Sequence, residues 1–103
     1  MKQIIIMYNL KPEISPEKFE EWVRTVDQPK MRGLTRVSQF RTFRSEALLM
    51  GEGQPSVQYI EVFDITDLDA FKGEDMPSDI VQMVLGAFMG MIDNPEFIIA
   101  SEV

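Results

Sequence analysis

The 103-residue chain contains no histidine and no cysteine. The missing histidine excludes Ser-His-Asp and Cys-His catalysis and imidazole ligation of zinc or haem. The missing cysteine excludes disulfides, thiolate chemistry, iron–sulfur clusters and cysteine zinc sites. Any metal would need oxygen ligands, and we expect neither a metal site nor a cofactor.

Positive charge is also scarce, because ten Lys and Arg residues face seventeen Asp and Glu residues, for a net charge of −7. Such a balance argues against nucleic acid and anionic lipid as partners. The apolar stretch near the amino terminus is too short for a membrane span and lacks a small-residue cleavage site. We therefore expect a soluble cytoplasmic protein.

The basic residues are unevenly placed, since nine of the ten lie in residues 1–44. They indicate either a local anion site or an ordinary solvated surface. With 45% apolar and 26% charged residues, the chain has a globular composition. Its length fits a single domain over residues 1–103.

Hydrophobic patterns and breakers predict a βαββαβ order. A first strand covers about residues 2–10, and Ser15-Pro16-Glu17 then begins an amphipathic helix that Asp27-Gln28-Pro29 should end. We expect further strands over about 35–45 and 57–65, separated by Gly51, Gly53 and Pro55. A short helix over 68–71, a helix from Pro77-Ser78 to about residue 92 and a final strand over 97–103 follow.

This order predicts an α+β, ferredoxin-like subunit with two helices on one face of a four-stranded antiparallel sheet. Three of the four strands are apolar on both faces, so the second face also needs a cover. No further element is available in the sequence. We therefore expect a homodimer that places two sheets face to face as a barrel-like dimer, with a cavity for a small molecule.

The strands after residue 35 supply candidate site residues. If the Gly51 region centres a hairpin, Arg41 stands opposite Glu61 and Phe43 opposite Tyr59, with Phe63 on the same face. Arg41 could then hold an oxyanion, Glu61 could transfer a proton and Tyr59 could donate a hydrogen bond. A plain cross-strand salt bridge between aromatic neighbours is the alternative.

The end of the first predicted helix supplies two more candidates. Without histidine, a carboxylate or tyrosine must perform any acid–base step, and Asp27 could do so at the cavity entrance. Asp27 could equally end the helix and pair with Lys30 or Arg32. Trp22 is either a binding wall or a core residue whose indole N–H needs a partner.

Several short segments resemble the RedY/HapK group of small proteins linked to prodigiosin-type pigment clusters, within the dimeric α+β barrel superfamily. They are Phe19-Glu20-Glu21-Trp22-Val23, Val26-Asp27-Gln28-Pro29, Tyr59-Ile60-Glu61-Val62 and Asp67-Leu68-Asp69-Ala70-Phe71. The resemblance implies a homodimer with a cleft for a small apolar molecule, such as a pyrrole-type intermediate. It also implies that Asp27-Gln28-Pro29 and the strand with Tyr59 and Glu61 are candidate site positions.

The leading hypothesis is thus a homodimeric small-molecule-binding protein of secondary metabolism that catalyses or assists one step on an apolar or aromatic intermediate. The candidate ligand-binding residues are Trp22, Asp27, Arg41, Phe43, Tyr59, Glu61 and Phe63, with Asp27 and Glu61 as catalytic candidates. The alternatives are a cofactor-independent monooxygenase or isomerase and a non-catalytic interaction subunit.

Overall fold

Four strands and six helical segments alternate along residues 1–103, all of which the computed structural model describes. The strands are β1 (Lys2–Leu10), β2 (Val37–Arg44), β3 (Tyr59–Ile65) and β4 (Ile92–Ser101). The helical segments are α1 (Pro16–Trp22), η1 (Val23–Asp27), α2 (Gln28–Arg32), α3 (Leu68–Ala70), η2 (Phe71–Asp75) and α4 (Asp79–Met89), in which η marks π-helical turns.

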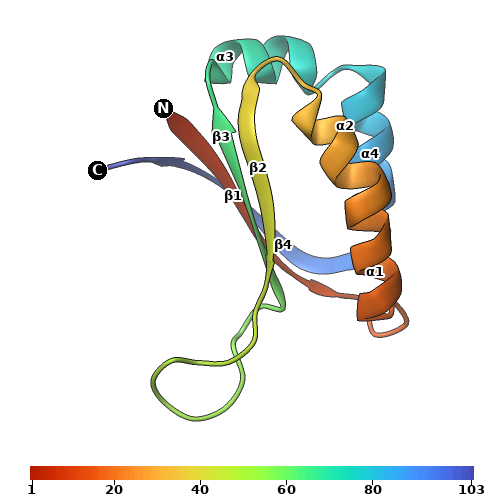
Figure 1. Ribbon diagram of the computed structural model, residues 1–103, viewed down its shortest axis with the longest axis vertical. Coiled ribbons are helices and arrows are strands. Elements are labelled where there is room, and N and C mark those ends of the chain that lie inside the picture. The colour runs from red at the N-terminus through yellow and green to blue at the C-terminus, as the bar shows by residue number, and fades with distance from the viewer.

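The strands form one antiparallel sheet in the order β2-β3-β1-β4. Helices α1, α2 and α4 cover one face of this sheet, and α3 lies near one end of it (Figure 1). The predicted ferredoxin-like βαββαβ arrangement is confirmed. It creates a space between sheet and helices into which side chains from both layers point.

Alternate strand residues face the helices and form the core. On β1 these are Ile6, Tyr8 and Leu10, and on β3 they are Tyr59, Glu61, Phe63 and Ile65. Phe19, Val84 and Phe88 pack onto them from the helices. Burying each large apolar side chain contributes about 1.5–3 kcal/mol. The core therefore fixes both the register of the strands and the rotation of the helices.

The first helical stretch begins as predicted but continues further. The Ser15 hydroxyl accepts a hydrogen bond from the Lys18 N–H, and Pro16 occupies the first turn. The prediction that Asp27-Gln28-Pro29 ends the helix is wrong, because helical turns continue to Arg32. In η1 the Gln28 N–H bonds to the carbonyl of Val23, five residues earlier. This wider turn accommodates Pro29, whose ring clashes with the preceding turn of a regular α-helix.

The last strand also begins earlier than predicted. Asp93-Asn94-Pro95 was expected to separate helix from strand, but β4 already pairs with β1 at Ile92. The register shifts between Met7 and Asn9 on β1, and Asn94 takes a positive φ of 53°. A β-bulge of this kind absorbs the turn-forming residues without ending the strand.

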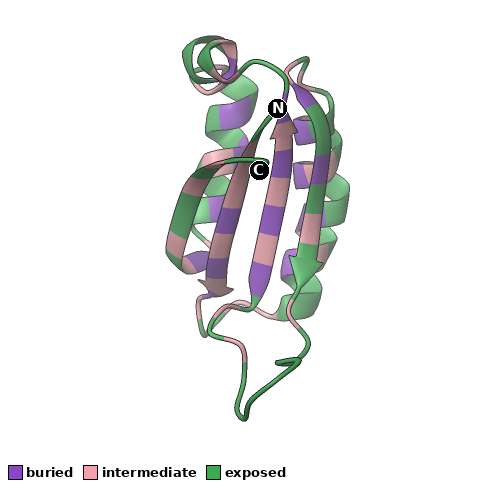
Figure 2. Ribbon diagram, turned by 90° about the vertical axis from the view of Figure 1, so that its left-hand side faces the viewer, coloured by how far each residue is buried: buried purple, intermediate pink, exposed green.

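The second face of the sheet has no cover within the chain, as Figure 2 shows. Ile5 pairs with Val62 and Ile98 on this face, and Met7 pairs with Ile60. These apolar side chains are only half-buried. The excess of apolar sheet surface expected from the sequence is therefore present in the folded subunit.

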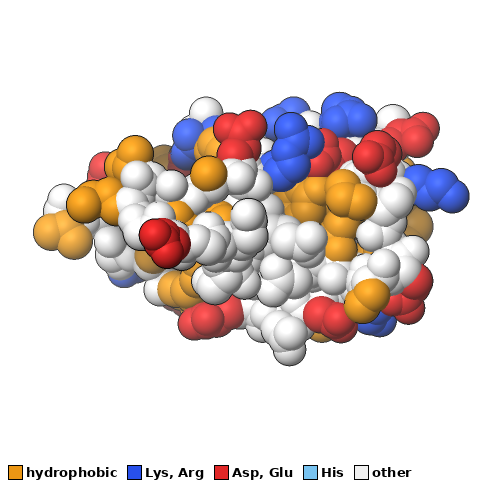
Figure 3. Space-filling view, turned by 90° about the horizontal axis from the view of Figure 1, so that it is seen from below, with side chains coloured by type: hydrophobic (Ala, Val, Ile, Leu, Met, Phe, Trp, Pro, Cys, Tyr) orange, Lys and Arg blue, Asp and Glu red, His pale blue; other side chains and the backbone are white.

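Residues 45–58 connect β2 to β3 as a long arm that projects past the end of the sheet (Figure 1). Gly51 and Gly53 turn it with positive φ angles of 88° and 96°. Its side chains include Leu48, Leu49 and Met50, which are 41%, 100% and 84% exposed. In the end-on view of Figure 3, hydrophobic side chains gather on the left, the side toward which the arm bends in Figure 1.

Helix α4 is less enclosed than its composition suggests. Val81, Val84 and Phe88 face the core, whereas Ile80, Met83 and Met89 are exposed on the opposite side. No helix in the structure combines the length and the apolar character that a bilayer span requires.

Candidate functional site

A cavity of about 250 Å³ lies between the sheet and the helices. Thirteen of its sixteen lining residues are hydrophobic. All of these except Met76, which follows η2, come from β1, β3, β4 and from the helical segments α2, α3, η2 and α4. The hydrophobic residues are Ile4, Ile6, Met31, Phe63, Leu68, Phe71, Met76, Val81, Val84, Leu85, Phe88, Phe97 and Ile99. Such a lining is typical of pockets that bind small apolar molecules.

Three lining residues carry charge or a titratable group, namely Asp27, Glu61 and Lys72. The two acids are almost completely buried, with exposed fractions of 4% for Asp27 and 2% for Glu61. Asp27 reaches the cavity from η1 and Glu61 from β3. The π-helical turn thus places a carboxyl that an uninterrupted α-helix would direct elsewhere.

The two acids differ in their hydrogen bonding. The hydroxyl of Tyr8, which is fully buried, donates to Glu61 Oε2. Asp27 Oδ2 is buried and has no hydrogen-bond partner. An unpaired buried polar atom is costly, so this oxygen is a natural acceptor or donor for a ligand in the cavity.

Burial controls the protonation of this pair. Desolvation raises the pKa of Asp27 well above its ordinary value. Desolvation also raises the pKa of Glu61, and the charge of Asp27 adds to the effect, whereas the hydrogen bond from Tyr8 opposes it. The two carboxyls therefore retain protons into the neutral range, where one can donate a proton while the other accepts one.

Aromatic packing holds Tyr8 in position. Its ring lies 5.7 Å from that of Tyr59 in a stacked arrangement and meets Phe88 and Phe19 edge-on at 4.8 Å and 5.8 Å. Burial, followed by the charge of Glu61 and the hydrogen bond to it, raises the pKa of Tyr8. Tyr8 therefore acts as a neutral hydrogen-bond donor to Glu61.

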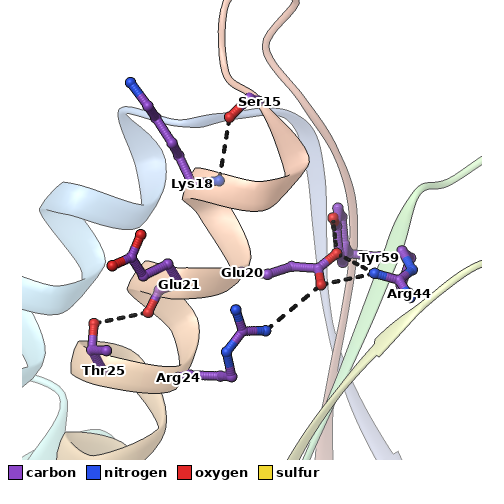
Figure 4. A network of polar contacts seen from close by, with 8 residues as sticks. All are labelled: Ser15, Lys18, Glu20, Glu21, Arg24, Thr25, Arg44 and Tyr59. Atoms are coloured by element: carbon purple, nitrogen blue, oxygen red, sulfur yellow. Dashed lines mark hydrogen bonds and ion pairs between the residues drawn. The ribbon is translucent and has the colours of Figure 1, made fainter.

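A second polar cluster lies beside the base of the arm (Figure 4). Glu20 on α1 accepts hydrogen bonds from Arg44 Nη1 at 2.8 Å and from the Tyr59 hydroxyl at 2.7 Å, and Arg24 lies 3.8 Å away. Desolvation raises the pKa of Glu20, but these bonds and the charges of Arg44 and Arg24 outweigh it and lower the pKa overall. This cluster ties α1 to the edge of the sheet.

The structure brings together some of the predicted site residues and separates others. Asp27, Glu61 and Phe63 all line the cavity. Trp22 and Tyr59 lie outside the lining: Trp22 stacks on Phe88 at 6.5 Å, and Tyr59 stacks on Tyr8.

The predicted register of β2 against β3 is wrong by one residue. Arg41 pairs with Val62 and Phe43 with Ile60, whereas Thr42 stands opposite Glu61. Because side chains alternate between faces, the slip places Arg41 and Phe43 on the uncovered face, away from the carboxyl pair. There the Arg41 guanidinium lies 5.7 Å from the centre of the Phe43 ring.

The sequence did not predict two residues of the site, Tyr8 and Lys72. Tyr8 shares the helix-facing set of β1 with Ile4 and Ile6, but the unbroken apolar run hid the alternation that would have revealed it. Lys72 is the only basic residue after Arg44, and this isolated positive charge was the one sequence feature that could have marked it as a candidate. No group of three or more acidic side chains is arranged to hold a metal ion.

Fold and cavity define this chain as an α+β protein with the ferredoxin-like βαββαβ fold. Residues 2–103 match the family described as REDY-like protein HapK, and the chain belongs to this family. It is similar to the crystal structure of HapK from Hahella chejuensis, with 29% identity and a TM-score of 0.80 over 100% of this chain and 93% of that one.

More distant structures share the fold. A protein described as of the ethyl tert-butyl ether D (EthD) family, from Bacillus halodurans, has 18% identity and a TM-score of 0.78, covering 100% and 99% of the two chains. A dimeric ferredoxin-like protein from Thermobifida fusca has 12% identity and a TM-score of 0.74, covering 98% and 90%. No curated protein matches the sequence significantly.

The raised pKa values predict an unusual pH dependence of stability. Each carboxyl binds its proton more tightly in the folded chain than in the unfolded one, where the pKa is about 4. The resulting stabilisation is complete below about pH 4 and is lost as pH rises through the raised values. The lowered pKa of Glu20 acts oppositely, but only at more acidic pH.

We expect Glu61→Gln to raise the free energy of unfolding at pH 8 by more than about 1 kcal/mol, because the amide still accepts from Tyr8 but cannot ionise. Urea unfolding at several pH values between 4 and 8 measures the free energy of unfolding of the wild type and the variant. Glu96→Gln, on an exposed carboxyl of β4, is the control. Equal pH dependence of the two variants would contradict the assignment.

Proposed function

We propose that the protein is a homodimer whose subunits each bind a small apolar or aromatic molecule in the cavity. The observation that carries this proposal is the Asp27–Glu61 pair in the wall of an otherwise apolar space, with one carboxyl oxygen lacking any partner. A ligand with an N–H or O–H group satisfies that oxygen, while its apolar body fills the rest of the cavity.

The family supports a role in secondary metabolism. An electron-rich aromatic molecule with a ring N–H, such as a pyrrole-type intermediate, has the chemistry that the cavity favours, since it combines a planar apolar body with one donor. We therefore propose that the chain binds an intermediate of the prodigiosin type and assists one step of its conversion.

Binding is tested with N-phenyl-1-naphthylamine, an apolar fluorescent molecule that carries one N–H group. We expect saturable binding to the wild-type protein and at least tenfold weaker binding to Leu85→Trp, which fills the cavity. Met89→Trp, at an exposed position of the same helix, should bind as the wild type does. Unaltered binding by Leu85→Trp would place the probe elsewhere and contradict the proposal.

The carboxyl pair favours a second candidate function, proton transfer without a cofactor as in an isomerase. A protonated carboxyl can donate a proton to a carbon of the ligand's ring. The ionised carboxyl of the pair can then remove the proton that this carbon carried before. Such an exchange balances without an oxidant.

This candidate predicts that the protein accelerates the replacement of ring hydrogens of 2,4-dimethylpyrrole in D₂O, followed by proton NMR. Asp27→Asn and Glu61→Gln should lose at least about 100-fold of this acceleration, as is usual for a general acid or base, and still bind N-phenyl-1-naphthylamine. A wild-type rate equal to that of the buffer would leave binding as the sole function.

Three observations support the homodimer. The uncovered face carries Ile5, Ile60, Val62 and Ile98. The arm, which carries the exposed Leu48, Leu49 and Met50, bends away from the side of the helices (Figure 1). Relatives of the same fold are described as dimeric. A second copy placed face to face covers both surfaces and forms a self-complementary, two-fold interface.

We expect the wild-type protein to elute from size exclusion with light scattering at twice its 11.9 kDa mass. Val62→Lys, which places a charge in the middle of the uncovered face, should shift the mass to that of one subunit. Gln82→Lys, at an exposed position of α4, should remain dimeric. A wild-type protein that is monomeric at micromolar concentration would refute the dimer.

A further inference from the structure

Lys72 is the one basic side chain that lines the cavity. It lies in η2, between Phe71, which points into the core, and Gly73. Unlike Asp27 and Glu61, Lys72 is exposed, so this lining residue lies where the cavity opens to solvent. The cavity therefore has buried acids in its wall and a cation at its opening.

The ammonium of Lys72 is also free of partners within the chain. The nearby acids of η2, Glu74 and Asp75, are engaged by Arg36. The other ion pairs join Glu20 to Arg24 and Arg44. Lys72 makes no ion pair or side-chain hydrogen bond, although the chain carries a surplus of acidic residues. The position of Arg36 thus leaves Lys72 available to a ligand.

We propose that Lys72 determines ligand specificity by selecting molecules whose apolar body ends in an anionic group. This inference rests on the proposed binding of a small molecule in the cavity and adds the second polar end of that molecule. The N–H or O–H donor of the ligand meets the Asp27–Glu61 pair inside, and a carboxylate or sulfonate meets the Lys72 ammonium at the mouth. The ligand class is an aromatic acid with a donor at its far end.

Two dyes separate this inference from cavity binding itself. N-phenyl-1-naphthylamine and 5-anilinonaphthalene-1-sulfonate share the same aromatic amine, but only the second carries a sulfonate, which lies on the opposite ring from the amine. The Lys72→Met variant retains an apolar stem and removes the charge. Lys18→Met removes an exposed lysine of α1 that does not line the cavity and serves as the matched control.

We expect Lys72→Met to weaken binding of the sulfonated dye about fivefold, the upper range for an exposed ion pair, and to change binding of the neutral dye less than twofold. Raising the salt concentration should reduce the affinity of the wild type for the sulfonated dye and narrow this gap. Lys18→Met should behave as the wild type with both dyes. Leu85→Trp should weaken both dyes, which confirms that they occupy the cavity.

Two results would overturn the role of Lys72. Equal losses for both dyes in Lys72→Met would show that the lysine contributes only its apolar stem, and unchanged affinity for the sulfonated dye would show that it makes no contact. In both cases, tight binding of the neutral dye leaves the cavity proposal intact. Failure of the neutral dye to bind the wild type would instead refute the cavity proposal, and the role of Lys72 with it.

Discussion

The structure depends on the burial of two carboxyl groups, Asp27 and Glu61, inside an apolar layer. Ionised and unpaired, each would cost several kcal/mol, so the fold favours their protonated forms and supplies Glu61 with the hydroxyl of Tyr8. Aromatic rings on both sides hold Tyr8 in place. A carboxyl whose pKa lies near neutrality can exchange its proton at neutral pH, which an ordinary exposed carboxylate does not do.

Much of the fold follows from sequence patterns. The Ser15-Pro16 helix start, the alternation along β3 and the excess of apolar sheet surface all carried local physical signals, and the structure confirms the ferredoxin-like order they predicted. The end of the first helix did not follow, since Pro29 normally breaks a helix and only tertiary packing reveals the π-helical turn that accommodates it. The same turn brings Asp27 into the cavity.

The site was predictable only in part. Asp27, Glu61 and Phe63 could be found because acids and aromatics stand out within apolar segments. Arg41 and Phe43 were assigned to the wrong face because the long arm fixes no register, and a shift of one residue inverts every side chain of a strand. Tyr8 joins the site through a contact between distant segments, which no local pattern encodes. Lys72 stands out in the sequence only as an isolated positive charge, which does not place it at a cavity.

The buried carboxyl pair is tested most directly by a carbon-13 NMR titration of the aspartate and glutamate side chains. The structure predicts that the signals of Asp27 and Glu61 move together and that the pair still holds a proton at pH 6. If both signals instead complete their titration below pH 5, the pair is solvated and the cavity holds no proton near neutral pH.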